Sequence, residues 1–276
     1  MNIACVIINY NDSKRVTSLA IKLNKYNFFS NIVIVDNDSK DEEISFLNTN
    51  LIENDVINIC YNSENLGYCK GTNVGFKYLL DKNCEYVFTI NTDIDVDFPT
   101  LQRLVEFLKN NNEYGACSCK MIEYGKEKNA YYKFPNVHDE NMQYLGLRKI
   151  FKAKVKPNKI QDDYMEVDFV RSSLCCFNYE YLSNVNFFDE NLFLYYCEAT
   201  TAKKFLDNNL KEAVLLNYTY QHNHIYSKAK INLLKLGYKD KVYTFNNYFP
   251  KSKFNMLRLK ICYKLGILIR KIFRFN

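Results

Sequence analysis

The run Tyr86-Val87-Phe88-Thr89-Ile90-Asn91-Thr92-Asp93 starts apolar and ends abruptly in polar side chains. A short apolar run of this kind is typical of a strand buried on both faces of a parallel sheet. Similar runs occur at residues 4–8, 32–35 and 56–60. Segments with helical patterns follow the four strands, at residues 13–25, 41–47, 71–80 and 98–110. This alternation predicts an α/β fold with a mostly parallel sheet flanked by helices.

Polar clusters follow each predicted strand, beginning at Asn9, Asp36, Asn62 and Asn91. In parallel sheets, ligands bind outside the carboxyl ends of the strands. The oxygens of the Asn91–Asp93 cluster are hard ligands suited to Mg²⁺ or Mn²⁺. The alternative is an ordinary loop, because Asn and Asp are also turn formers.

The second half has a less regular pattern. Residues 124–165 are polar with scattered aromatics and indicate loop with short elements, whereas 167–177 and 214–220 indicate strands and 198–206 a helix. We treat residues 1–227 as one domain and 228–276 as a basic helical extension.

The charge is distributed unevenly over the 276 residues. The net charge is +6, but nine cations and no acidic residue follow Asp240, so residues 1–240 hold 28 basic and 31 acidic residues, a net of −3. An acidic body argues against a nucleic-acid-binding protein, and we expect no nucleic-acid partner.

The ten cysteines contain no Cys-x-x-Cys pair, and several lie in apolar runs. We therefore expect reduced thiols in a cytosolic protein. The first residues lack the charged region and cleavage site of a signal peptide, and no stretch approaches the roughly 18 apolar residues of a spanning helix. We expect neither secretion nor a membrane span.

Three glycines, Gly67, Gly71 and Gly75, recur every four residues and would form one stripe on a helix. Such a stripe lets a flat ligand approach the backbone, or it lets the helix pack closely on the sheet. Asp36 has two interpretations as well, a contact to a nucleobase or ribose and a helix cap.

Taken in order, these motifs resemble one family, the inverting glycosyltransferases of family 2 with the GT-A fold, and most closely its bacterial rhamnosyltransferase-like members. The resemblance covers about residues 3–227. The matching runs are residues 6–11, 34–39, 65–75, 90–93, 188–198 and 222–227.

The resemblance implies a pocket for a UDP- or dTDP-linked sugar donor. Asn9 and Asp36 would hold the base and ribose. Asn65, Gly67 and Asn73 would line the nucleotide pocket.

The resemblance also implies a Mn²⁺ or Mg²⁺ ion that bridges the two phosphates. Asp93 would bind the metal, with Asn91 beside it as a neutral partner. His224, or failing it His222, is the candidate further ligand or diphosphate contact. The alternative for these histidines is an ordinary surface position.

The chain departs from the family at the catalytic acidic motif. The motif usually reads Glu-Asp-x-Asp, with its first aspartate as the general base, whereas residues 198–201 read Glu198-Ala199-Thr200-Thr201. Glu198 or Asp189 is then the candidate base. The alternative is a weakened or inactive member that binds nucleotide-sugar or glycan without efficient turnover.

The C-terminal residues predict a basic amphipathic helix, with Leu257, Ile261, Leu265, Leu268 and Ile272 on one face. Such a helix fits an anionic membrane surface. The alternatives are packing on its own domain or on a second subunit in a homodimer. We expect a peripheral protein of the inner membrane face that glycosylates a glycan or lipid-linked glycan of a bacterial surface polysaccharide, such as a capsule or O-antigen.

Overall fold

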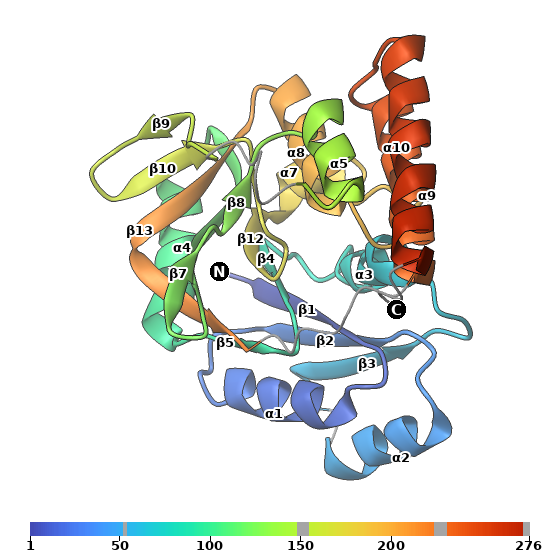
Figure 1. Cartoon of the computed structure of the whole chain (residues 1–276). Helices are drawn as coiled ribbons and strands as arrows, with labels where there is room; N and C mark the ends of the chain where they lie inside the picture. Colours follow the sequence, from blue (N-terminus) through green and yellow to red (C-terminus); the bar gives the residue numbers. More distant parts are fainter. Residues whose placement is uncertain (52–53, 148–154, 224–230, 273–276) are drawn as a thin grey trace.

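The computed structural model describes residues 1–51, 54–147, 155–223 and 231–272 (Figure 1). Its first half is a series of strands and helices: β1 (Ile3–Asn9), α1 (Ser13–Asn24), β2 (Asn31–Asp36), α2 (Asp41–Asn50), β3 (Ile57–Tyr61), α3 (Gly67–Tyr78) and β4 (Tyr86–Ile90). The four strands pair in parallel in the order β3-β2-β1-β4. The four predicted strands are confirmed, each within one residue at its ends.

The second half extends this sheet. Its elements are β5 (Ile94–Asp95), α4 (Phe98–Asn110), β6 (Tyr114–Glu123), β7 (Lys126–Lys128), β8 (Tyr131–Tyr132), α5 (Val137–Tyr144), β9 (Lys159–Ile160), β10 (Tyr164–Val167), β11 (Phe169–Val170), β12 (Leu174–Asn178), α7 (Tyr179–Asn184), α8 (Cys197–Asp207) and β13 (Lys211–His222). The strand order is β3-β2-β1-β4-β12-β6-β13-β10-β9. Strand β12 runs antiparallel to β4 and β6, whereas β6 and β13 are parallel.

The predicted strand over residues 167–177 is two strands in the structure. Strand β11 pairs with β8 in a separate two-stranded sheet, and β12 joins the central sheet. Residues 171–173 lie between them and are free of strand pairing, which lets Ser172 and Ser173 contact the loops at the strand ends. The other predictions for this half are confirmed: short elements within residues 124–165, a helix over 198–206, which is α8, and a strand over 214–220, which is part of β13.

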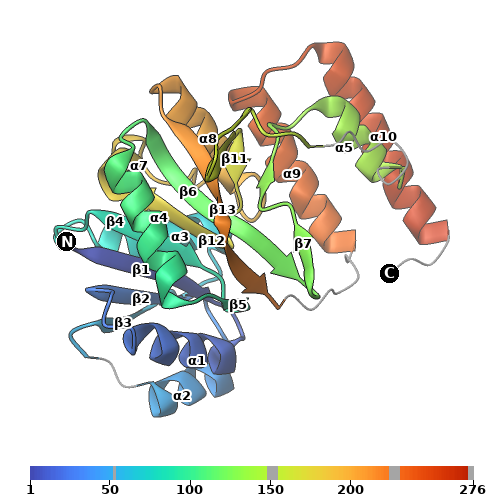
Figure 2. The same ribbon diagram turned by 90° about the vertical axis from the view of Figure 1, so that its left-hand side faces the viewer.

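Helices cover both faces of the sheet. In Figure 1, α1 lies below β1, β2 and β3 and α3 lies above them, and in Figure 2 α4 lies in front of the strands. Helix α4 begins after Asp97, whose carboxylate accepts a hydrogen bond from Thr100 N at 2.9 Å, and it has proline in its first turn. Helix α3 packs tightly, because a Cβ on Gly75 would lie 2.5 Å from Val6 Cγ1. The glycine stripe therefore serves helix packing at this position.

Two C-terminal helices, α9 (Ile231–Asn247) and α10 (Lys253–Ile272), stand beside α5 (Figure 1). Asp240 of α9 is 1% exposed, and its carboxylate accepts hydrogen bonds from the backbone N–H groups of residues 193–195 at 3.0–3.2 Å. Helix α10 buries Leu259 and Gly266, and Arg270 donates to Tyr144 O at 3.0 Å. One face of α10 thus packs on its own chain.

All ten cysteines are free in the structure. Most of them are buried among apolar side chains, and burial raises the pKa of thiols such as Cys117 and Cys175. Buried thiols of this kind are inert and act as small hydrophobic residues.

Candidate active site

The first two strand ends contribute a buried polar pair. Asn9 and Asp36 lie opposite each other in the parallel ladder of β1 and β2, and Asn9 Nδ2 donates to Asp36 Oδ2 at 2.7 Å. Both residues are 0% exposed, and Asp36 Oδ1 also accepts from Ser39 N at 3.0 Å. The two buried side chains thus hold together the loops that follow β1 and β2.

The start of α3 is held by a network around Asn37. Asn65 Oδ1 accepts hydrogen bonds from Asn37 Nδ2 at 3.0 Å and from Gly67 N at 2.9 Å. Gly67 has a φ of +76°, and a Cβ there would lie 2.3 Å from the carbonyl oxygen of Phe193. A glycine is required at this position, both for its backbone conformation and for the close contact.

Asn73 joins α3 to the segment that precedes α8. Its Nδ2 donates to Phe188 O at 2.9 Å and to Glu190 Oε1 at 3.1 Å, and its Oδ1 accepts from Phe188 N at 3.1 Å. The side chain is 2% exposed. Gly67 and Asn73 thus hold α3 against residues 188–193, whereas Asn65 bonds to Asn37 and Gly67 at the start of the helix.

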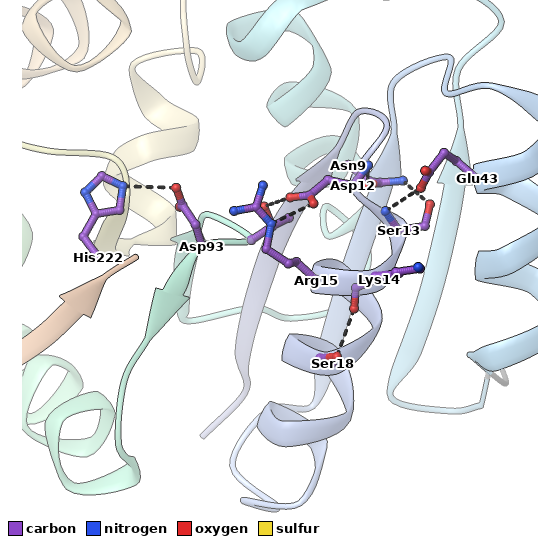
Figure 3. Close-up of polar contacts among 10 residues, drawn as sticks. Asn9, Asp12, Ser13, Lys14, Arg15, Ser18, Glu43, Asp93 and His222 are labelled. Atoms are coloured by element: carbon purple, nitrogen blue, oxygen red, sulfur yellow. Dashed lines mark hydrogen bonds and ion pairs between the residues drawn. The ribbon is translucent and has the colours of Figure 1, made fainter. Parts of the chain in front are cut away.

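Asp93 faces a histidine at the end of β4. His222 Nε2 lies 3.4 Å from Asp93 Oδ2 (Figure 3). On its other side, His222 Nδ1 lies 3.5 Å from Glu123 Oε1. Strand β13 positions this histidine, because His222 pairs with Ile94 and Asn223 N donates to Asp93 O at 2.8 Å. The predicted residue His224 lies outside the described residues.

The carboxylate of Asp12, a residue not predicted for the site, extends this cluster. Asp12 Oδ2 accepts a hydrogen bond from Thr92, and Asp12 Oδ1 lies 2.8 Å from Arg15 Nε (Figure 3). Asp12 therefore connects the loop after β1 with the loop after β4. Its place at the end of a buried strand was a signal that could have identified it.

Glu198 lies in the first turn of α8. Its Oε1 accepts hydrogen bonds from Ser172 Oγ at 2.7 Å and from Ser172 N at 3.3 Å. The next residue, Ser173, accepts a hydrogen bond from Asn91 N at 2.9 Å through its carbonyl. Residues 172 and 173 thus connect the Asn91–Asp93 loop directly to Glu198, across about 100 residues of sequence.

The other candidate base, Asp189, is occupied by neighbours. Its carboxylate accepts hydrogen bonds from Tyr248 Oη at 2.6 Å, Tyr243 Oη at 3.0 Å and Asn191 N at 2.9 Å. Burial raises its pKa, but these hydrogen bonds outweigh burial, and the net shift is downward. A carboxylate with a lowered pKa and several committed lone pairs is a poor proton acceptor.

Ala199 fills the position where the family usually has its base. The side chain is 1% exposed and packs in an apolar cluster with Phe169 and Ala202. Thr201, at the second altered position, is also 1% exposed, and its hydroxyl has no hydrogen-bond partner among the described residues.

A second glutamate lies close behind Glu198. Glu198, Thr201 and Glu212 line a cavity of about 10 Å³, the lower limit for one water molecule. Glu212 is 4% exposed, and Val170 N donates to its Oε2 at 2.8 Å. Burial raises the pKa of Glu212 to about 8, the Val170 hydrogen bond opposes the rise, and the charge of Glu198 adds to it. The sequence had no signal for this residue, since a single glutamate at a strand start is usually exposed.

Glu198 and Ala199 also line a larger pocket of about 340 Å³. The pocket lies where β8, β11 and the residues before α8 meet α5 and α9. Aromatic side chains form much of its wall. Asp189 is not among its lining residues, so of the two candidate bases it is Glu198 that faces this space.

Comparison with known proteins gives a family match over much of the chain. Residues 4–165 match the model of the family described as glycosyl transferase family 2. No curated protein sequence matches the chain.

Several solved structures share the fold. Mannosyltransferase PcManGT from Pyrobaculum calidifontis, in complex with GDP-Man and Mn²⁺, is 12% identical with a TM-score of 0.58, over 96% of this chain and 72% of that one. S. aureus TarS 1-349 with UDP-GlcNAc is 16% identical with a TM-score of 0.59, over 94% and 70%. GalNAc-T7 with UDP, GalNAc and Mn²⁺ is 11% identical with a TM-score of 0.62, over 90% and 49%, so this chain spans about half of its length. These likenesses confirm the GT-A fold.

Proposed function

The chain belongs to glycosyl transferase family 2, and from this premise we propose that it transfers a sugar from a nucleoside-diphosphate donor to a saccharide acceptor, with inversion at the anomeric carbon. The donor we propose is UDP- or dTDP-linked. TarS with UDP-GlcNAc supports a uridine donor. The motif resemblance to rhamnosyltransferase-like members is the reason for including a dTDP-linked donor.

One observation carries the proposal. The Asn91–Asp93 loop, His222 and Glu198 come from distant parts of the sequence. Ser173 bonds to Asn91, Ser172 bonds to Glu198, and His222 lies beside Asp93. A metal-ligand pair and a carboxylate that faces a pocket are the groups that sugar transfer from a diphosphate donor requires.

The donor atoms at Asp93 fit a divalent cation. One carboxylate and one imidazole face each other, and Mn²⁺ accepts both oxygen and nitrogen ligands. Glu123 lies behind the imidazole and would orient it, as second carboxylates do for metal-bound histidines. Within the described residues, no three His, Cys, Asp or Glu side chains are placed so that together they could hold a metal ion. We propose that the donor diphosphate supplies the further ligands. PcManGT and GalNAc-T7 were both solved with Mn²⁺.

Glu198 would act as the general base in this mechanism. Its carboxylate is held by Ser172 and faces the pocket, where it would take the proton of an acceptor hydroxyl. That oxygen would form a bond to the anomeric carbon while the bond to the diphosphate breaks on the opposite face. A bound cation supplies Lewis-acid stabilisation of the diphosphate that leaves.

A second candidate function is binding of nucleotide-sugar or glycan without efficient turnover. Ala199 favours it, because alanine cannot accept a proton and is packed against Phe169. The two candidates differ in turnover and agree in donor binding.

We also propose that α10 places the enzyme on an anionic membrane surface, at the cytoplasmic face of a bacterial inner membrane. The predicted apolar stripe is exposed in the structure, with Leu257, Ile261, Leu265, Leu268 and Ile272 between 45% and 64% exposed. Beside it, exposed lysines recur on one flank of the helix, at Lys253, Lys260, Lys264 and Lys271. Apolar side chains flanked by cations suit insertion among anionic headgroups. None of the described helices has both the length and the apolar character to cross a bilayer.

The acceptor we propose is a glycan or lipid-linked glycan of a bacterial surface polysaccharide, such as a capsule or O-antigen. An enzyme held at the membrane would meet such an acceptor where it is assembled. Pairing of α10 with a second copy is the competing role for the exposed stripe, and it would appear as a dimer in solution.

The experiment is a thermal-shift screen of UDP-, dTDP- and GDP-sugars with and without Mn²⁺. A ligand that binds the native state raises the unfolding temperature. We expect a rise with one donor in the presence of Mn²⁺. No rise with any donor would contradict the proposed function.

A further inference from the structure

The pocket beside Glu198 has aromatic walls on several sides. Tyr132 and Phe169 come from the β8–β11 pair with ring centroids 5.7 Å apart, and Tyr144 comes from α5. Tyr195 and Tyr196 come from the turn before α8. A volume of about 340 Å³ is at the lower end for small-molecule sites, so a small saccharide is a suitable occupant.

The Tyr195 ring packs against α9 at Gly237. A Cβ on Gly237 would lie 3.1 Å from this ring, so glycine leaves room for close contact. Tyr195 is 38% exposed, which means that a large part of the ring remains accessible. The ring therefore offers a flat apolar face to an occupant of the pocket.

Both lysines that line the pocket among the described residues have anionic partners. Lys241 Nζ lies 2.5 Å from Glu140 Oε2 and 4.0 Å above the Tyr144 ring. Lys133 Nζ lies 3.0 Å from Asp168 Oδ1. A phosphate or carboxylate on a ligand would need a cation that is not committed in this way, and it would also meet the charge of Glu198.

We propose that this pocket binds the acceptor as an uncharged saccharide stacked on the Tyr195 ring, an inference that rests on the proposed function. The two faces of a sugar ring expose C–H groups, which are buried favourably against aromatic faces. The ring edge has hydroxyl groups, which need hydrogen-bond partners once they leave water. Glu198 and Gln143 lie in the pocket lining and provide such partners.

The test measures saccharide binding to the full chain by saturation-transfer NMR. The neutral probes are maltose, cellobiose, lactose and N-acetyllactosamine, and the anionic probes are glucose 6-phosphate and a glucuronate disaccharide. Tyr195→Ala removes the ring, and Tyr195→Phe is the matched control that keeps the ring and removes the hydroxyl. Circular dichroism establishes that both variants are folded, as expected for a partly exposed side chain.

We expect a neutral probe to bind, Tyr195→Ala to weaken binding about tenfold, and Tyr195→Phe to stay close to wild type. Preference for the anionic probes, unchanged binding to Tyr195→Ala, or no binding of any neutral probe at millimolar concentration would each overturn the inference.

Calorimetry of UDP and dTDP on the same protein separates this inference from the proposed function. Neutral saccharides that bind without any nucleotide binding would leave the pocket assignment standing and contradict glycosyl transfer. Nucleotide binding together with selective binding of anionic saccharides would contradict the pocket assignment and leave the proposed glycosyl transfer standing.

Discussion

Glu212→Gln is expected to make stability less dependent on pH and to stabilise the protein near and above neutral pH. Glu212 is buried on β13 behind Glu198, and burial raises its pKa from 4.5 to about 8. The folded protein therefore retains a proton there that the unfolded chain releases near pH 4.5. Glutamine keeps the shape of the protonated acid, and its carbonyl oxygen can still accept the Val170 hydrogen bond.

The magnitude follows from the shift of about 3.5 pKa units, which corresponds to about 5 kcal/mol at about 1.4 kcal/mol per unit. Because the folded state binds this proton more tightly, the contribution of Glu212 is fully favourable below about pH 4.5 and is lost as pH rises to about 8. Between pH 5.5 and 7.5 the group alone should lower the free energy of unfolding by about 2.5 kcal/mol.

Urea unfolding at pH 5.5, 6.5 and 7.5 measures this difference. The wild-type protein should lose about 2.5 kcal/mol more than Glu212→Gln over this range. Glu113→Gln, which alters an exposed glutamate just before β6, is the matched control and should follow the wild type. Equal pH dependence in wild type and Glu212→Gln would refute the idea that Glu212 is buried in its protonated form.

Three further predictions concern the metal, the base and the tail. Asp93→Ala should abolish Mn²⁺-dependent donor binding in calorimetry while the protein stays folded. Asp95→Ala, which removes an exposed carboxylate nearby, should leave donor binding unchanged. Equal donor affinities of Asp93→Ala and the wild type would contradict the assignment of Asp93 as a metal ligand. Glu198→Gln should abolish the wild-type rate. Ala199→Asp should raise turnover, by less than the about 10²- to 10⁴-fold that a positioned base contributes where there is none, because Glu198 already acts as a base. If neither variant changes the rate, the base lies elsewhere. Deletion of residues 251–276 should release the protein from anionic vesicles in a flotation assay, and wild-type binding should weaken with salt; binding that survives the deletion would assign it to another surface.

The first half of the fold follows from local pattern, and so it was predictable. Each of its strands is a short apolar run with a helix after it; β1, β2 and β3 pair in sequence order, and β4 pairs with β1. The second half depends on pairings between distant segments, such as β6 with both β12 and β13. Periodicity does not contain that information, and the split of residues 167–177 into two strands was missed for this reason.

The candidate site was predictable in residue type and only partly in arrangement. Asp93 lies at the end of a buried strand as expected, because chain polarity places strand ends at one edge of the sheet. The sequence could not show that Asn9 and Asp36 bond to each other, with neither exposed. It also could not show that Ser172 and Ser173 join Glu198 to the Asn91–Asp93 loop, since such contacts depend on the assembled sheet.

The measurement that tests the central claim most directly is the release of nucleoside diphosphate from each donor sugar, with Mn²⁺ and a neutral disaccharide acceptor present. We run it on wild type and on Ala199→Asp, and we identify the product by mass spectrometry. The account predicts a glycosylated acceptor with one donor, at a rate that rises in Ala199→Asp. Donor that remains intact in both proteins, together with the absence of nucleotide binding, would contradict it.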